Sequence, residues 1–216
     1  MIELHYHPGN ASMAPHLLLE EIGQPFALKK VDRANLAHKS PDYLRLNPNG
    51  LIPAMTDGDL VLFETAAILL HLADTHPAAQ LMPALGTAER AHAYKWLMWL
   101  TNTVQPALIA YFYPERWVAD GNTAGAAEVK GRAEARVGEL LDILAAEFTR
   151  HGGPWTLGER YSALDPMTFM LCRWTRGFGR PARERPVLAA YLARMAERPA
   201  LQRVMATEGL ADAPWY

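Results

Sequence analysis

The sequence predicts a mixed α/β domain of order βαβαββα, followed by an all-helical domain. Up to residue 75, short apolar strands alternate with helical patterns. The segment HPAAQLMPALG then carries two prolines and a glycine without a clear period, which is typical of a linker. Beyond it only long, alanine-rich helical patterns follow. We therefore expect one domain at residues 1–76, a linker at 77–86 and a helical bundle domain at 87–216.

Prolines, glycines and turns mark the ends of helices and strands in the first domain. Pro15 lies in the first turn of an apolar helical stretch, and Gly23 ends it. The turn at residues 56–59 separates two short apolar runs, which favours an antiparallel hairpin. The strands that we expect are residues 2–6, 27–31, 52–55 and 60–63, and the helices are residues 14–22, 40–46 and 66–74.

The second domain is predicted to consist of helices. Pro106 is expected to kink or break the first of them. Ser162 and Asp165 have the spacing of a capping box, in which two side chains satisfy backbone N–H groups at a helix start. The helices that we expect are residues 88–111, 126–150, 162–174, 187–196 and 200–208.

Composition excludes several classes of function. The chain has 216 residues and a formal net charge of −2, so no basic excess is present to bind nucleic acid. No apolar run is long enough to span a membrane and the first residues do not resemble a signal peptide, so we expect a cytoplasmic protein. The histidines lack metal-ligand spacing, so no metal is expected. Cys172 is the single cysteine and is expected to be a buried apolar residue.

Pro53 opens a strand candidate directly after a glycine turn. A proline there cannot donate a ladder hydrogen bond, so it is either an ordinary edge-strand proline or a cis proline. In the cis case the backbone of Ile52 would turn outward. Its N–H and C=O could then capture an extended peptide by strand pairing.

Glu64 and Thr65 stand where a strand ends and a helix begins. They are either an ordinary helix start, with Thr65 as cap, or a site for an α-amino-acid head group. In the second case the free N–H groups and the hydroxyl would bind a carboxylate, and Glu64 would pair with the ammonium.

Ser12 lies in the loop between the first strand and the first helix. It is either a plain helix cap or a hydroxyl that stabilises a thiolate. One charge-assisted hydrogen bond contributes ~1.5–3 kcal/mol, which lowers the pKa of a thiol by about one to two units. A serine hydroxyl would therefore suffice to keep a bound thiol ionised.

These motifs together resemble the cytosolic glutathione S-transferases over almost the whole chain, and the first is similar to the bacterial beta class. The motifs that carry the resemblance are YHPGNASMAPH, NPNGLIPAM, FETAAILLHLAD and GERYSALDPMTF. The resemblance implies a thioredoxin-like first domain, glutathione as co-substrate and a role in detoxification. It implies a cis Pro53, Ile52 paired with the cysteinyl backbone of glutathione, Glu64 and Thr65 on its γ-glutamyl end, and His38 and Lys39 near its glycine carboxylate.

The chain departs from the beta class in the loop. Where such sequences carry a cysteine, this chain has Ala11, between Asn10 and Ser12. A mixed disulfide with a loop cysteine is therefore excluded. Gln105 and Pro106 also replace a His-Lys pair of the family. The candidates for activating the glutathione thiol are Ser12, Asn10 or backbone N–H groups alone.

The resemblance implies that aromatic side chains of the helical domain line a pocket for a hydrophobic electrophile. The residues that we assign to it are Tyr113, Arg116 and Trp174, and the terminal Trp215 and Tyr216 add to the aromatic content. Such proteins are homodimers, and residues 82–99 could supply the contact surface.

Three functions compete. The leading one is a transferase that adds the glutathione thiolate to an electrophile; peroxidase, isomerase and dehalogenase chemistry would use the same thiolate. The second is a non-catalytic, regulatory protein that keeps the glutathione site, which the missing cysteine favours. The third is a glutathione-dependent disulfide oxidoreductase that relies on Asn10.

Overall fold

The computed structural model describes residues 1–210 and consists of a small sheet region followed by helices. In chain order the first region contains β1 (Ile2–Tyr6), α1 (Met13–Ile22), β2 (Phe26–Lys30), α2 (Pro41–Leu46), β3 (Ala54–Asp57), β4 (Leu60–Phe63) and α3 (Thr65–Thr75). The helices that follow are α4 (Ala88–Trp99), α5 (Gln105–Phe112), α6 (Thr123–His151), α7 (Leu164–Trp174), α8 (Pro186–Ala196) and α9 (Pro199–Thr207). The order βαβαββα is the predicted one; the domain limits stay a prediction.

The four strands form one mixed sheet in the order β2-β1-β3-β4. β1 pairs with β2 in parallel, and β3 pairs with β1 and β4 in antiparallel fashion. A two-residue turn at Gly58 and Asp59 closes the predicted hairpin, and Gly58 has a φ of +59°, which glycine adopts readily. β3 begins two residues later than predicted, so Ile52 and Pro53 stay outside the ladder.

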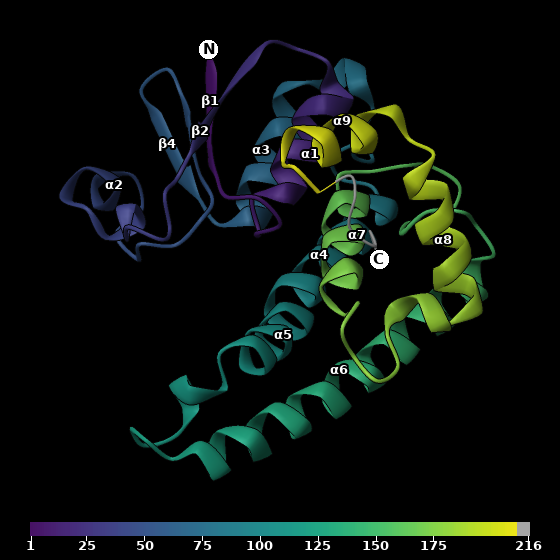
Figure 1. Cartoon of the computed structure of the whole chain (residues 1–216). Helices are drawn as coiled ribbons and strands as arrows, with labels where there is room; N and C mark the ends of the chain where they lie inside the picture. Colours follow the sequence, from purple (N-terminus) through teal and green to yellow (C-terminus); the bar gives the residue numbers. More distant parts are fainter. Residues whose placement is uncertain (211–216) are drawn as a thin grey trace.

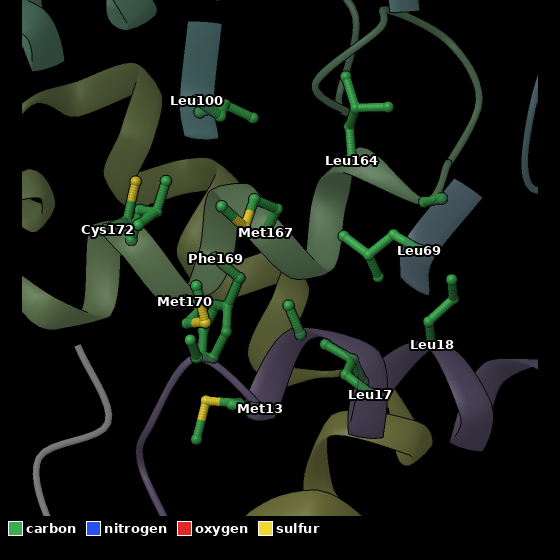
Figure 2. Close-up of a cluster of buried hydrophobic side chains, with 14 of the residues drawn as sticks. Met13, Leu17, Leu18, Leu69, Leu100, Leu164, Met167, Phe169, Met170 and Cys172 are labelled. Carbon is green, nitrogen blue, oxygen red and sulfur yellow. The ribbon is translucent and has the colours of Figure 1, made fainter. Parts of the chain in front are cut away.

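The hydrophobic core is continuous between the sheet region and the helices. α1 packs against α3 on one side and against α7 and α9 on another (Figure 1). Figure 2 shows Met13 and Leu17 of α1 in one cluster with Met167 and Phe169 of α7. All four side chains are completely buried. Two ion pairs join α1 to the α9 segment: Glu21 pairs with Arg198, just before α9, and Glu20 pairs with Arg203 within it.

Two features of the sequence can be followed in the helices. The capping box forms: Asp165 Oδ2 accepts a hydrogen bond from Ser162 N at 2.7 Å, and Ser162 Oγ accepts one from Leu164 N at 3.3 Å. Pro106 coincides with a change of helix type and not with a break, because a π-helical segment, Leu100–Val104, connects α4 directly to α5. A proline has no N–H to donate back along the helix, and this missing hydrogen bond accounts for the local change of helix type.

Within residues 1–210, no helix is both long and apolar enough to cross a membrane. The same residues contain no cluster of three or more His, Cys, Asp or Glu side chains able to hold a metal ion.

Candidate functional site

The loop after β1 is closed by Ser12. The Ser12 hydroxyl accepts a hydrogen bond from His7 N and donates one to His7 O, both at 3.1 Å. Ser12 is completely buried, so its hydroxyl points into the loop. This differs from the expectation that Ser12 presents its hydroxyl to a ligand. It also makes no capping bond to α1.

Asn10 is the half-buried polar side chain of this loop. Its Oδ1 accepts a hydrogen bond from Ala11 N at 2.6 Å. Because that bond fixes the carboxamide with its oxygen toward the backbone, the Nδ2 donors point the other way. Nδ2 has no hydrogen-bond partner within residues 1–210. Asn10 can therefore donate to a bound thiolate.

Gly9 ties the loop to the helical region. Its N–H donates to Glu208 Oε2 at 2.7 Å, and its C=O accepts from Trp174 Nε1 at 3.1 Å. The other oxygen of Glu208 lies 2.8 Å from His16 Nδ1, and both side chains are fully buried. No local sequence pattern marks His16 or Glu208, because their roles depend on a contact between residues 192 positions apart.

Arg173 places a positive charge beneath the same loop. Its side chain is almost completely buried, and Nη1 lies 3.6 Å from where a Cβ would stand at Gly9. Burial lowers the pKa of Arg173 to about 10, with a further lowering by Arg176 and an opposing effect of Glu208. The guanidinium is therefore charged at neutral pH. Its Nε has no partner among the described residues.

The peptide bond between Ile52 and Pro53 is cis, as the resemblance implied. The ladder between β1 and β3 ends at His5 and Ala54, so Ile52 lies two residues before the first paired residue of β3. In residues 1–210 the Ile52 backbone N–H and C=O have no hydrogen-bond partner. Tyr43 Oη and Asn47 Nδ2 both donate to Leu51 O, at 2.8 and 2.9 Å, which fixes the chain just before Ile52.

Glu64 and Thr65 stand at the start of α3 as predicted, but the cap position is Glu64 and Thr65 is the first helical residue, which differs from the expectation that Thr65 is the cap. Glu64 is exposed and has a φ of +72°, in the left-handed region, whereas Thr65 is buried. Glu64 makes no capping side-chain bond. The exposed carboxylate and the free N–H groups of the first helical turn therefore stand next to each other.

His38 and Lys39 lie in a 3-10 turn, Ala37–Lys39, before α2. Lys39 Nζ donates to Asn49 O at 3.1 Å. Burial lowers the pKa of His38, and the charges of Lys39, Arg33 and His7 lower it further. This part of the surface is therefore electropositive.

The residues assigned to the second substrate lie on the helical side of the loop. Trp174 is buried and makes an edge contact with Phe112, with ring centroids 6.1 Å apart. Tyr113 follows Phe112 at the end of α5, and the Arg116 guanidinium lies 4.0 Å from the centre of its ring. Arg33 donates to Tyr113 Oη at 3.2 Å, a contact that the sequence did not indicate. Trp215 and Tyr216 lie outside the described residues.

Cys172 is buried in α7, as predicted, among the apolar side chains of Figure 2. Burial raises the pKa of its thiol to about 12. It is therefore a protonated core residue at neutral pH.

Comparisons with known proteins agree on one family. The family described as "Glutathione S-transferase, N-terminal domain" matches residues 2–74. Glutathione S-transferase GstA of Escherichia coli O157:H7 is 29% identical over 97% of this chain and 100% of its own length. Among solved structures, a glutathione transferase homologue from Sulfitobacter with bound glutathione has a TM-score of 0.87 at 27% identity, covering 96% of this chain and 98% of that one. The beta-class glutathione S-transferase of Sphingomonas chungbukensis has a TM-score of 0.82 at 32% identity, covering 96% of this chain and 99% of that one.

Proposed function

This chain belongs to the glutathione S-transferase family and is a glutathione transferase, and on that premise we propose that it adds the glutathione thiolate to a hydrophobic electrophile beside Asn10. The observation that carries the proposal is the free Nδ2 of Asn10 in the loop before α1, together with the unpaired backbone of Ile52. The thioredoxin-like sheet region holds the peptide, and the helical region holds the electrophile.

Glutathione is held along the chain segment that precedes β3. The Ile52 N–H and C=O are free to pair with the cysteinyl residue, as one strand pairs with another. Glu64 is exposed and accepts the γ-glutamyl ammonium, while the first N–H groups of α3 and the Thr65 hydroxyl receive its carboxylate. The electropositive turn with His38 and Lys39 faces the glycine carboxylate.

Asn10 is the side chain that we assign to the thiolate. Its Nδ2 is available for donation, whereas the Ser12 hydroxyl is occupied by His7. A hydrogen bond to a charged group contributes about 1.5–3 kcal/mol, or about one to two pKa units of the thiol. The charge of Arg173 acts in the same direction. Ser12 is then a positioning residue that keeps the loop closed.

In the reaction the sulfur of the thiolate forms the new bond to the electrophilic carbon. For a substitution, the leaving group departs with the electron pair of its bond to that carbon. The protein contributes by ionising the thiol and by holding both reactants. The exposed ring of Phe112 and the ring of Trp174 behind it offer an apolar surface for the electrophile.

A homodimer in the cytoplasm, with a role in detoxification, is part of the same proposal. Large apolar side chains are exposed on the edge strand β4, namely Leu60 and Val61, and on one face of α4, namely Tyr94 and Met98. Exposed apolar groups of this kind favour contact with a second copy. Light scattering on the purified protein would test this: a mass of about 24 kDa, that of one chain, would contradict the dimer.

The thiol assignment is tested by titrating bound glutathione through the ultraviolet absorbance of its thiolate. We expect the native protein to lower the thiol pKa, and Asn10→Ala to raise it again by about one unit. Asn102→Ala, at an exposed asparagine of the π-helical segment, is the matched control and should leave the pKa as in the native protein.

Two outcomes would overturn the assignment. If glutathione binds to the native protein with an unchanged thiol pKa, the transferase mechanism is wrong. If Asn10→Ala behaves like the control while Ser12→Ala loses the shift, the thiolate belongs to Ser12.

A further inference from the structure

Two guanidinium groups flank one phenol at the end of α5. Arg33 Nη2 donates to Tyr113 Oη at 3.2 Å. The Arg116 guanidinium stacks over the Tyr113 ring, 4.0 Å from its centre, in a cation–π contact. Tyr113 Oη accepts from Arg33, so its own O–H remains free to donate. Three donor groups for an anion, two guanidinium groups and one phenol, are thus gathered in one place.

This group stands beside the loop that binds the thiol. Arg33 comes two residues after Val31, whose C=O lies 3.1 Å from His7 Nδ1 in that loop. Tyr113 follows Phe112, which contacts Trp174, and Trp174 in turn donates to Gly9 O. The group therefore combines Arg33 from the sheet region with Tyr113 and Arg116 from the helical region.

The positive charge of the two arginines is not neutralised by the protein. Neither Arg33 nor Arg116 forms an ion pair within residues 1–210. Asp32 stands next to Arg33 but accepts its hydrogen bonds from Asn35. Arg116 is exposed and Arg33 is half-buried, so a ligand can approach both.

We propose that Arg33, Tyr113 and Arg116 bind a carboxylate of the second substrate. The preferred electrophile is then an apolar or aromatic molecule with a carboxylate at the end remote from the reacting carbon. The apolar part lies against Phe112, and the carboxylate meets the guanidinium groups, which bind such anions well. This inference rests on the proposed transfer of glutathione and adds the class of its second substrate.

Glutathione itself also carries carboxylates, and Arg33 contributes to the electropositive surface near His38. The two sources of a carboxylate predict different results. A residue that binds the electrophile changes the preference between electrophiles. A residue that binds glutathione changes the KM for glutathione and lowers turnover of every electrophile alike.

The test uses a matched pair of electrophiles, 4-(chloromethyl)benzoate and its neutral methyl ester. We expect the native protein to have the higher kcat/KM for the carboxylate. In the double variant Arg33→Met and Arg116→Met this preference should fall about tenfold, with an unchanged KM for glutathione. Arg160→Met is the control, because Arg160 is exposed and lies in the loop between α6 and α7.

A second readout works without turnover. Quenching of tryptophan fluorescence would compare binding of the unreactive 4-methylbenzoate and 4-methylbenzamide to the complex with glutathione. Tighter binding of the benzoate, lost in the double variant, supports the inference. Equal binding, or equal losses for both electrophiles, overturns it. Absence of conjugation together with selective benzoate binding would instead overturn the proposed transfer and leave the carboxylate site standing.

Discussion

Ser12 shows how burial decides the role of a single hydroxyl. Its Oγ serves both backbone groups of His7 and has no exposed surface. A serine at a helix start is an ordinary cap in most proteins, but here the hydroxyl closes the six-residue loop from His7 to Ser12 instead. The shape of the thiol-binding loop therefore depends on this side chain even though the side chain does not face the ligand.

Replacing Ser12 by alanine should cost stability. The His7 N–H would lose its partner in a partly buried place, and the His7 C=O would keep only the bond from Asn10 N, so we expect the free energy of unfolding to fall by about 1–3 kcal/mol. Urea unfolding measures it. Ser40→Ala, which removes the cap of the short exposed helix α2, is the comparison and should cost about 1 kcal/mol or less. A Ser12→Ala protein as stable as the native one would contradict this role.

For single residues, the sequence predicted those candidate site residues that are marked by a pattern in their own segment. Ile52, Pro53, Glu64 and Thr65 are marked by turns and helix starts in their own segments. The direction of the Ser12 hydroxyl could not be predicted, because it depends on which backbone groups the folded loop leaves without partners. Glu208 could not be predicted either, since it reaches Gly9 from 199 residues away.

Among the elements, α7 has a buried carboxylate in its first turn. Asp165 is completely buried and accepts four hydrogen bonds, two from Thr156 and two from Ser162. It thereby fixes the loop before α7 as well as the helix start. The capping box could be predicted from its spacing, whereas the bonds from Thr156 required knowledge of the loop.

Asp165→Asn should destabilise the protein strongly at pH 7. The asparagine NH₂ group would face N–H and O–H donors, so we expect a loss of about 2–4 kcal/mol. Circular dichroism during thermal or urea unfolding measures it. The exposed substitution Asp42→Asn, in α2, is the control and should change stability by less than about 1 kcal/mol.

The pH dependence of this variant has a defined sign. Burial raises the pKa of Asp165 to about 6, against the effect of its hydrogen bonds, whereas an unfolded aspartate has a pKa of about 3.9. The folded state holds the proton to higher pH, so the contribution of Asp165 to stability falls as pH rises from about 4 to about 6. The stability difference between the native protein and Asp165→Asn should therefore be larger at pH 4 than at pH 7. A difference that grows with rising pH would contradict this.

The long helix predicted at residues 88–111 illustrates what propensity cannot resolve. Pro106 predicted an interruption of this helix, and the prediction allowed either a kink or a complete break. The structure takes a third course, because the π-helical segment Leu100–Val104 lets α5 continue directly from α4. α5 packs against α6, and a tertiary contact of this kind leaves no pattern in a single sequence.

At the scale of the whole molecule, α1 is part of the core of both the sheet region and the helical region. It packs against α3 of the sheet region and against α7 and α9 of the helical region. The ion pairs to α9 and the contact between Gly9 and Glu208 strengthen the same connection. The order of the elements could be predicted from the sequence, but this shared core could not, because the pairing of distant helices leaves no periodic signal.

We therefore expect the two regions to unfold together. All six tryptophans follow residue 87, so tryptophan fluorescence reports on the helical region, whereas far-ultraviolet circular dichroism reports on the whole chain. The two urea transitions should coincide in midpoint and slope. Two separate transitions, with the sheet region melting first, would show that the core contacts of α1 do not couple the regions.

The burial of Cys172 has a practical consequence for laboratory work. A thiol with a pKa of about 12 inside the core hardly reacts with Ellman's reagent or with maleimide dyes as long as the protein is folded. In a colorimetric thiol assay the folded enzyme would then contribute no background, and all colour would come from free glutathione. The rate at which the same cysteine is labelled would report the rate of unfolding, since labelling would begin only when the core opens.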